Sequence, residues 1–170
     1  MKQTYKLYLL GVGLALLMTL GWAVALTGPA RAQTAAHNID RAEILAAYDA
    51  FKSAQNERDL PKVGTYFIDG PEFLWVSDGQ SYWGREAVLT RMSLFQGAGV
   101  WRVEPDLTSA RVVELGPDVA MLNMRLVLVI GSAAKPSTLP FLVSILFRRT
   151  GEPADWKIAA LLTTGDTTPG

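Results

Sequence analysis

Few residues of this chain have side chains that could carry out nucleophilic, metal or acid–base chemistry. The sequence contains one histidine, His37, and no cysteine. His37 falls in a small polar segment, and a general base must be held within hydrogen-bond reach of its proton, so we expect no catalytic role for it. Zinc sites of the usual kind need cysteine or several histidines, and no acidic cluster has the spacing of a calcium loop. The sequence therefore predicts no metal site and no cofactor.

Acid–base work by a carboxylate in an apolar pocket is the enzymatic possibility that remains, because the mature region has no G-x-S-x-G, P-loop or G-x-G-x-x-G motif. Asp78 is the best carboxylate for this role, and it could act as a base at the mouth of a pocket. The alternative is a turn residue, because aspartate before a glycine suits a tight turn, and Gly79 follows it. We favour the turn.

Two polar residues, Asn123 and Arg125, interrupt an apolar segment. Polar groups in such a segment need partners, and these two could hold the carboxylate or hydroxyl group of a ligand. The alternative for Arg125 is a structural salt bridge to a neighbouring strand, for which the candidates are Glu104, Asp106 and Glu114. Aromatic residues could wall a pocket near them or belong to an ordinary core, and these are Trp75, Tyr82, Trp83 and Trp101.

The N-terminal segment has the organisation of a secretory signal peptide. An apolar run from Leu7 to Leu26 follows two lysines, and a Gly-Pro breaker then precedes the A-x-A pattern of Ala30, Arg31 and Ala32. This order predicts that residues 1–32 are removed by cleavage after Ala32 and that the protein is periplasmic or secreted. The alternative is a retained anchor, since about 20 apolar residues can span a bilayer.

The rest of the chain has the size of one domain, preceded by a mobile leader at 33–38 and followed by a short tail at 166–170. The predicted domain, 39–165, has no cysteine, so its stability must come from packing. Lysine plus arginine equals aspartate plus glutamate, at 16 each. That balance does not suit a nucleic-acid-binding protein.

Helix signals come first along the domain. Asp40 is a suitable N-cap for a helix from Arg41 to about Glu57, with Glu43 completing a capping box. Leu60-Pro61 predicts the start of a second helix, and a third is expected between Gly84 and Gly97. Asp78-Gly79 predicts a hairpin between the second and third helices.

The remainder of the domain has the pattern of strands, so the fold class is α+β. The expected strands are residues 101–103, 108–115, 119–130, 141–149 and 156–163. Both faces of the longest strands are rich in apolar residues, so one face needs the helices and the other needs a cover. We expect a homodimer, because exposed apolar patches commonly mark interfaces. The alternative is a monomer whose loops cover this face.

The order of elements within Asn56–Arg91 resembles the first half of an NTF2-like domain of the SnoaL-like or DUF4440 kind. This resemblance implies a cone in which three N-terminal helices pack on a curved, mostly antiparallel sheet around a pocket. It also implies that a second subunit pairs with the outer sheet face. Aligned on Asn56, Asp59 and Phe67, Phe51 falls at the oxyanion-binding tyrosine of the related isomerases, Trp75 near their general base and Ile145 near their late-strand acid. None of these three can transfer a proton, which disfavours isomerase chemistry.

The function predicted from the sequence is binding of an unidentified small hydrophobic or amphipathic molecule in an apolar pocket. One alternative is an isomerase, dehydratase or hydrolase that uses Asp78, Tyr82 and Arg125. The other is a dimeric interaction module with a filled pocket, which a cavity of about 300 Å³ or more would disfavour. The candidate ligand-binding residues, none of them assigned a catalytic role, are Phe51, Trp75, Asp78, Tyr82, Trp101, Asn123 and Arg125.

Overall fold

A computed structural model describes residues 39–151 and 155–167 of the chain. They belong to one unit, residues 36–170. The predicted signal peptide, the leader with His37 and the end of the tail lie outside the described residues. Within the described part, none of the helices has the length and apolar character needed to cross a membrane.

Helix α1 spans Arg41–Asn56 and begins where the sequence supplies a cap. The Asp40 carboxylate accepts a hydrogen bond from the backbone N–H of Ala42 at 2.8 Å, which satisfies a free donor of the first turn. Glu43, expected to complete a capping box, instead accepts a hydrogen bond from Trp156 Nε1 at 3.0 Å and ties the helix to the sheet. The buried side chains recur at helical spacing, and they are Ile44, Tyr48, Phe51, Ala54 and Gln55.

The turn that follows, Asn56–Asp59, joins three parts of the fold. The Asn56 side chain donates to the backbone oxygen of Val103 at 3.1 Å and accepts from its backbone N–H at 2.8 Å. Arg58, at a φ of 60°, donates to three backbone carbonyl oxygens within residues 96–99 at 2.7 to 3.1 Å. Asp59 caps helix α2, Leu60–Thr65. The turn therefore holds α1 against a strand and against the end of α3, Arg85–Gln96.

The predicted hairpin consists of β1, Leu74–Ser77, and β2, Gln80–Trp83, paired antiparallel. Asp78 and Gly79 have φ values of 54° and 71°. These positive values are what a two-residue hairpin turn of type I′ requires. The turn interpretation of Asp78 therefore agrees with its backbone conformation.

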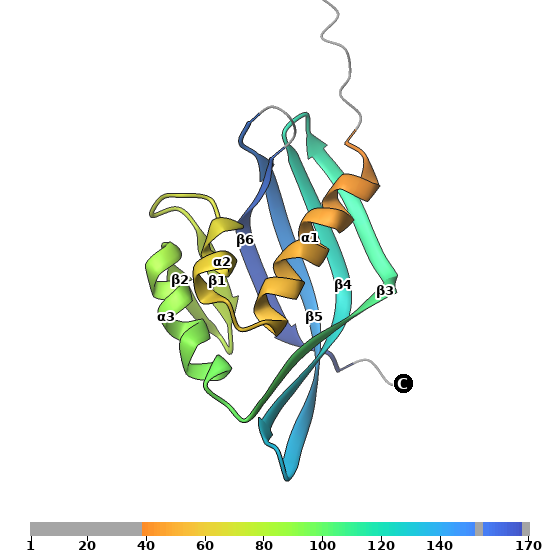
Figure 1. Ribbon diagram of the computed structural model, residues 1–170. Helices are drawn as coiled ribbons and strands as arrows, with labels where there is room; N and C mark the ends of the chain where they lie inside the picture. The colour runs from red at the N-terminus through yellow and green to blue at the C-terminus, as the bar shows by residue number, and fades with distance from the viewer. Residues whose placement is uncertain (1–38, 152–154, 168–170) are drawn as a thin grey trace, which may run out of the picture. The chain divides into compact units, whose positions relative to one another are not determined.

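Six strands form one sheet in the order β2-β1-β6-β5-β4-β3. The four long strands are β3, Val100–Gly116; β4, Val119–Ser132; β5, Lys135–Arg149; and β6, Trp156–Gly165. All neighbours pair antiparallel except β1 and β6, which are parallel. The α+β prediction is confirmed, with helices first and a mostly antiparallel sheet after them (Figure 1).

Two strand predictions were wrong in detail. The segments expected at 101–103 and 108–115 belong to one strand, β3, whose register with β4 shifts between Asp106 and Arg111. β3 is an edge strand, where the missing N–H of Pro105 is tolerated. The segment before residue 141, which was expected to be a loop, is part of β5. Pro136 and Pro140 precede Phe141, the first residue of β5 that pairs with β6, so their missing N–H groups are tolerated at a free edge.

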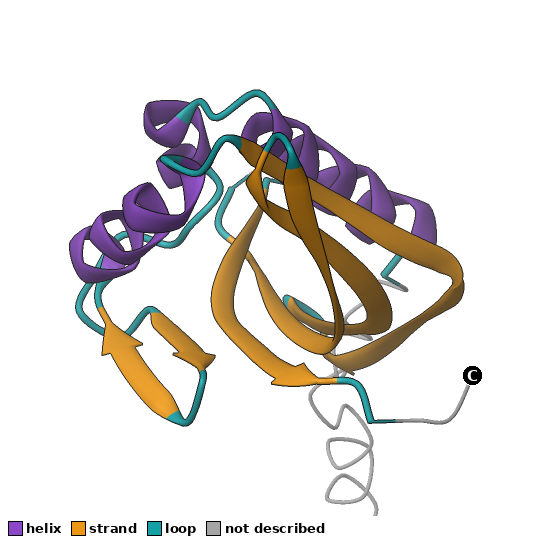
Figure 2. Ribbon diagram, turned by 90° about the horizontal axis from the view of Figure 1, so that it is seen from below, coloured by secondary structure: helices purple, strands orange, loops and turns teal. Residues whose placement is uncertain are grey.

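Helix α1 lies across one face of β3 to β6, which we call the inner face (Figure 1), and Figure 2 shows the strands curving beneath the helices. Alternate residues of β4 point to this face, and Ala120, Leu122 and Met124 are buried there. The opposite, outer face carries partly exposed apolar side chains, namely Val113, Leu142 and Leu162, at 42%, 37% and 38% exposure. The inner face is therefore the place for an enclosed site.

Candidate functional site

A cavity of about 160 Å³ lies between the inner face of the sheet and helices α1 and α3. Its wall is mostly aromatic and aliphatic, which suits an apolar occupant. The residues that line it are Tyr48, Phe51, Gln55, Trp75, Ser77, Asp78, Met92, Phe95, Trp101, Val103, Leu126, Leu128, Ile130, Leu139, Phe141, Val143, Leu161 and Thr163.

The cavity is smaller than the pockets of about 300 to 1,000 Å³ that hold drug-sized ligands, and it does not reach the volume that would disfavour an interaction module. An apolar cavity of about 150 Å³ in another protein takes up benzene. The volume here therefore fits a molecule of about the size of a substituted benzene ring.

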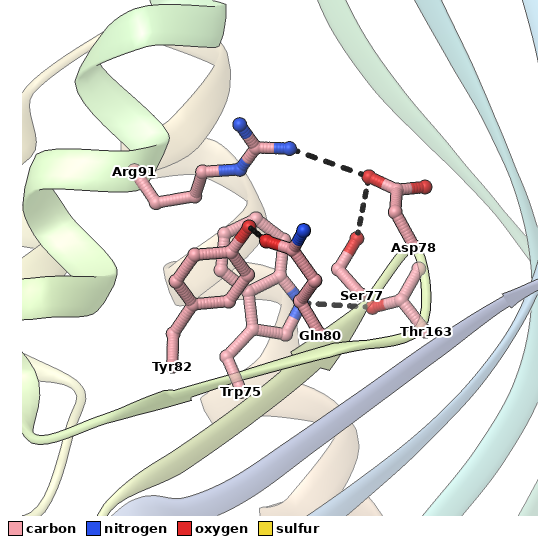
Figure 3. Close-up of polar contacts among 7 residues, drawn as sticks. All are labelled: Trp75, Ser77, Asp78, Gln80, Tyr82, Arg91 and Thr163. Atoms are coloured by element: carbon pink, nitrogen blue, oxygen red, sulfur yellow. Dashed lines mark hydrogen bonds and ion pairs between the residues drawn. The ribbon is translucent and has the colours of Figure 1, made fainter.

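Aromatic rings form a continuous part of the wall. Phe95 meets Trp75 edge-on at 6.4 Å between ring centroids and stacks on Trp101 at 6.4 Å. Trp75 also packs against Tyr82 at 5.7 Å. The Trp75 indole N–H donates to Thr163 Oγ1 at 3.0 Å, which joins β1 to β6 through side chains as well as backbone (Figure 3). These contacts fix the ring positions, so this wall is preorganised.

An ion pair lies beside the cavity at the hairpin turn, where Asp78 belongs to the wall and Arg91 does not. Arg91 of α3 reaches toward Asp78, with 3.4 Å between Nη2 and Oδ2 (Figure 3). Its guanidinium lies 4.3 Å from the centroid of the Phe95 ring and 5.3 Å from that of Tyr82. Asp78 Oδ2 also accepts a hydrogen bond from the Ser77 hydroxyl at 3.3 Å. The carboxylate is thus engaged by its neighbours and well exposed, at 62%, which is not the environment of a buried base.

Two polar atoms of residues in the wall have no partner among the described residues, namely Tyr48 Oη and Trp101 Nε1. Tyr48 comes from α1 and is 2% exposed. Burial raises the pKa of Tyr48 well above its ordinary value, and the negative charge of Asp49 adds to the shift. The hydroxyl therefore stays protonated through the neutral pH range and can donate a hydrogen bond.

The structure places four of the seven sequence candidates on the cavity wall, namely Phe51, Trp75, Asp78 and Trp101. Tyr82 packs behind Trp75, and its hydroxyl donates to Gln80 Oε1 at 2.9 Å (Figure 3). Tyr82 borders an open groove beside α3 and not the cavity.

Asn123 and Arg125 correct the sequence interpretation, because both lie on the outer face, away from the cavity. On β4 they alternate with the buried Leu122 and Met124, so strand geometry points them outward. Asn123 donates to Ser144 Oγ at 2.9 Å. Arg125 pairs with Asp166 at 3.1 Å, a partner that was not among the three acidic residues expected.

Sequence reasoning missed several wall residues, of which Tyr48 and Gln55 matter most chemically. Tyr48 lies on the buried stripe of α1, where its ring is hard to distinguish from an ordinary core residue in the sequence. Gln55 is 7% exposed and stands four residues after Phe51. A polar residue at that spacing on a buried stripe was an available signal of a polar position in the wall.

The chemistry available in the cavity is limited. Asp78 is the one acidic residue among those that line it. Phe51 and Trp75 line the wall, and Ile145 is buried in the core. No group of three or more histidine, cysteine, aspartate or glutamate side chains in the described part of the chain is arranged to hold a metal ion. The arrangement suits binding through apolar contact and a few hydrogen bonds.

Solved structures with similar folds come from several bacteria. A candidate dehydratase of the NTF2-like family from Streptomyces avermitilis is 19% identical, with a TM-score of 0.63 over 75% of this chain and 97% of that one. A ketosteroid isomerase-like protein from Erwinia carotovora atroseptica is 18% identical, with a TM-score of 0.61 over 78% and 99% of the two chains. An NTF2-like protein of unknown function in nutrient uptake from Rhodospirillum rubrum is 22% identical, with a TM-score of 0.59 over 72% and 98%. At these identities the likeness shows the fold alone.

No curated protein matches the sequence. The sequence profile of the SnoaL-like domain, in contrast, matches residues 44–161. This range begins in α1 and ends in β6, and it includes every residue that lines the cavity except Thr163. The chain therefore belongs to the SnoaL-like family, and its fold is that of the NTF2-like proteins.

Proposed function

We propose that this chain is an exported protein that binds a compact, largely apolar molecule between its helices and the inner face of its sheet. The observation that supports this function is the cavity of about 160 Å³ with its aromatic and aliphatic wall. A molecule of matching size gains free energy by leaving water for such a site. The fixed aromatic rings lower the ordering cost of binding.

Catalysis has less support than binding. The neighbours with similar folds include proteins described as a candidate dehydratase and as ketosteroid isomerase-like, but function depends on the site and not on the fold. Asp78, the acidic residue of the wall, lies at the edge of the cavity in an ion pair with Arg91. A general base in an apolar site would need a carboxylate deeper in the cavity.

A matched pair of variants tests the binding function. Leu128→Trp adds bulk to the cavity wall, whereas Leu142→Trp makes the same change on the outer face. We expect toluene to raise the thermal midpoint of the parent and of Leu142→Trp, and to leave that of Leu128→Trp unchanged, because ligand binding to the native state stabilises it. Mass spectrometry of an organic extract of protein purified from its own host would identify the natural ligand.

Toluene that stabilises neither the parent nor Leu142→Trp would refute the binding function. The alternative would then be the interaction module, in which the small cavity is only a packing defect. Equal stabilisation of all three proteins would refute the assignment of the site, because the bulky residue at position 128 would not have displaced the ligand.

Export and self-association complete the proposal. The A-x-A pattern after the apolar N-terminal run supports cleavage after Ala32, and N-terminal sequencing of the exported protein would detect any retained Met1. The partly exposed apolar side chains of the outer face support a homodimer. A two-fold arrangement would place the same face of each copy against the other.

A further inference from the structure

The exposed residues of the cavity wall mark where the cavity meets solvent. Among the lining residues that the structure describes, Asp78 and Leu139 are the two that are exposed. Asp78 lies in the turn between β1 and β2, and Leu139 lies on β5 before Phe141, the first residue of that strand that pairs with β6. On the β6 side, β5 therefore has no neighbouring strand at Leu139. We call the region between Asp78 and Leu139 the mouth of the cavity.

The mouth carries a negative charge. Asp78 is the one charged residue that lines the cavity, and the wall includes no lysine, arginine or histidine. Both contacts of its carboxylate are made by Oδ2, which lies 3.4 Å from Arg91 Nη2 and 3.3 Å from Ser77 Oγ. Oδ1 points away from these partners (Figure 3) and has none of its own among the described residues. The side chain is 62% exposed, so a group at the mouth can reach this oxygen.

The volume of the cavity separates the apolar part of a ligand from its polar part. A cavity of about 160 Å³ holds one benzene-sized ring, so a chain attached to the ring must extend to the mouth. The apolar wall favours the ring inside. A charged group at the mouth keeps part of its hydration, which avoids the high cost of burying it. Asp78 attracts a cation there and repels an anion.

We propose that the ligand is a cationic amphiphile, an arylalkylamine whose aromatic ring occupies the cavity and whose ammonium group lies at the mouth beside Asp78. This inference rests on the proposed binding function and specifies its ligand class. Arg91 engages Oδ2, so the ammonium group pairs with Oδ1, and one carboxylate can accept from both cations. Asp78 serves here in recognition and transfers no proton.

Three compounds with the same ring and the same two-carbon chain test the sign of the charge, namely 2-phenylethylamine, 2-phenylethanol and 3-phenylpropionate. At pH 7 the amine is protonated and the carboxylate is ionised. In calorimetric titrations at low salt, the amine should bind about two- to fivefold more tightly than the alcohol, which is the range that an exposed ion pair contributes. The carboxylate should bind more weakly than the alcohol. These differences should shrink in 1 M sodium chloride, because salt screens exposed charges.

Two matched variants locate the charge that is responsible. Asp78→Asn removes the charge and keeps the turn, because Asn-Gly suits a type I′ turn, and it should bind the amine and the alcohol equally. Asp69→Asn makes the same change at another exposed carboxylate, which pairs with Arg85 at 3.0 Å and does not line the cavity. This control should keep the preference of the parent for the amine. Circular dichroism establishes that each variant is folded before binding is measured.

The outcomes separate this inference from the binding function on which it rests. Equal binding of the amine and the alcohol by the parent would overturn the inference and leave the function intact. The same holds for a preference for the amine that survives in Asp78→Asn, that is lost in Asp69→Asn, or that persists undiminished in 1 M salt. Binding of none of the three compounds by the parent would remove both.

Discussion

Replacing Asn56 by alanine should destabilise the protein strongly, although Asn56 does not line the cavity. Its side-chain amide pairs with both the N–H and the C=O of Val103, at 2.8 and 3.1 Å. Val103 is 6% exposed and lies on β3, the edge strand. The amide therefore pairs with the backbone of this edge strand at Val103, in the way that the backbone of a neighbouring strand would.

The expected loss can be worked from these two bonds. A hydrogen bond contributes about 0.5 to 1.5 kcal/mol net, and a buried group left without a partner costs about 1 to 3 kcal/mol. Alanine removes both partners of Val103, but water can reach part of this half-buried site. We therefore expect the free energy of unfolding to fall by about 2 to 3 kcal/mol, which lowers the melting temperature of a domain of this size by about 10 °C.

Urea unfolding gives the change in stability, and amide hydrogen exchange locates it. The N–H of Val103 should lose protection in Asn56→Ala more than the amides in the middle of β5 do. Ser53→Ala, one turn earlier in α1, controls for the general effect of alanine on the helix. A fall of less than about 1 kcal/mol, which is the size of one ordinary hydrogen bond, with unchanged exchange at Val103, would show that water replaces the amide and would refute this account.

Two further predictions concern a buried hydroxyl and the outer face. The pKa of Tyr48 is higher in the folded protein than in the unfolded chain. The free energy of unfolding should therefore fall as the pH rises above about 10, by up to about 1.4 kcal/mol per pH unit. Urea titrations at pH 9 and 11 should show a smaller fall for Tyr48→Phe than for the parent, and an identical fall in both proteins would contradict this prediction. If the outer face forms a homodimer, Leu142→Glu should yield monomers in sedimentation at micromolar concentration, because it buries a charge at the interface. A parent that sediments as a monomer would exclude this interface.

Local signals were sufficient to predict much of the fold. The N-cap at Asp40, the proline in the first turn of α2 and the Asp78-Gly79 turn each act over a few residues, and the helices and hairpin lie where they indicated. The continuity of β3 could not be predicted in the same way. In the sequence, Pro105 indicates the end of a strand. The pairing of β3 with β4 nevertheless resumes after a shift of register, and only the structure of the pair shows this.

The site was harder to predict, because successive residues of a strand point to opposite faces of the sheet, one toward the cavity and the next toward solvent. Arg125 and Leu126 are neighbours in the chain, yet Leu126 lines the cavity and Arg125 pairs with Asp166 on the outer face. With apolar residues on both faces of β4, composition gave no indication of which face was inward. Phe51 was easier to place, since it belongs to the one buried stripe of α1, and Trp75 on the hairpin also lines the cavity.

The positions of Phe51 and Tyr48 show why membership of a family does not determine the chemistry of this cavity. The resemblance to the isomerases places Phe51 at their oxyanion-binding tyrosine, where it offers no donor. Tyr48, three residues earlier on the same face, carries a buried hydroxyl that has no partner among the described residues. A donor moved by three residues along a helix shifts by about 4.5 Å along the helix axis. Membership of the family therefore does not predict which polar groups lie beside the cavity of this chain.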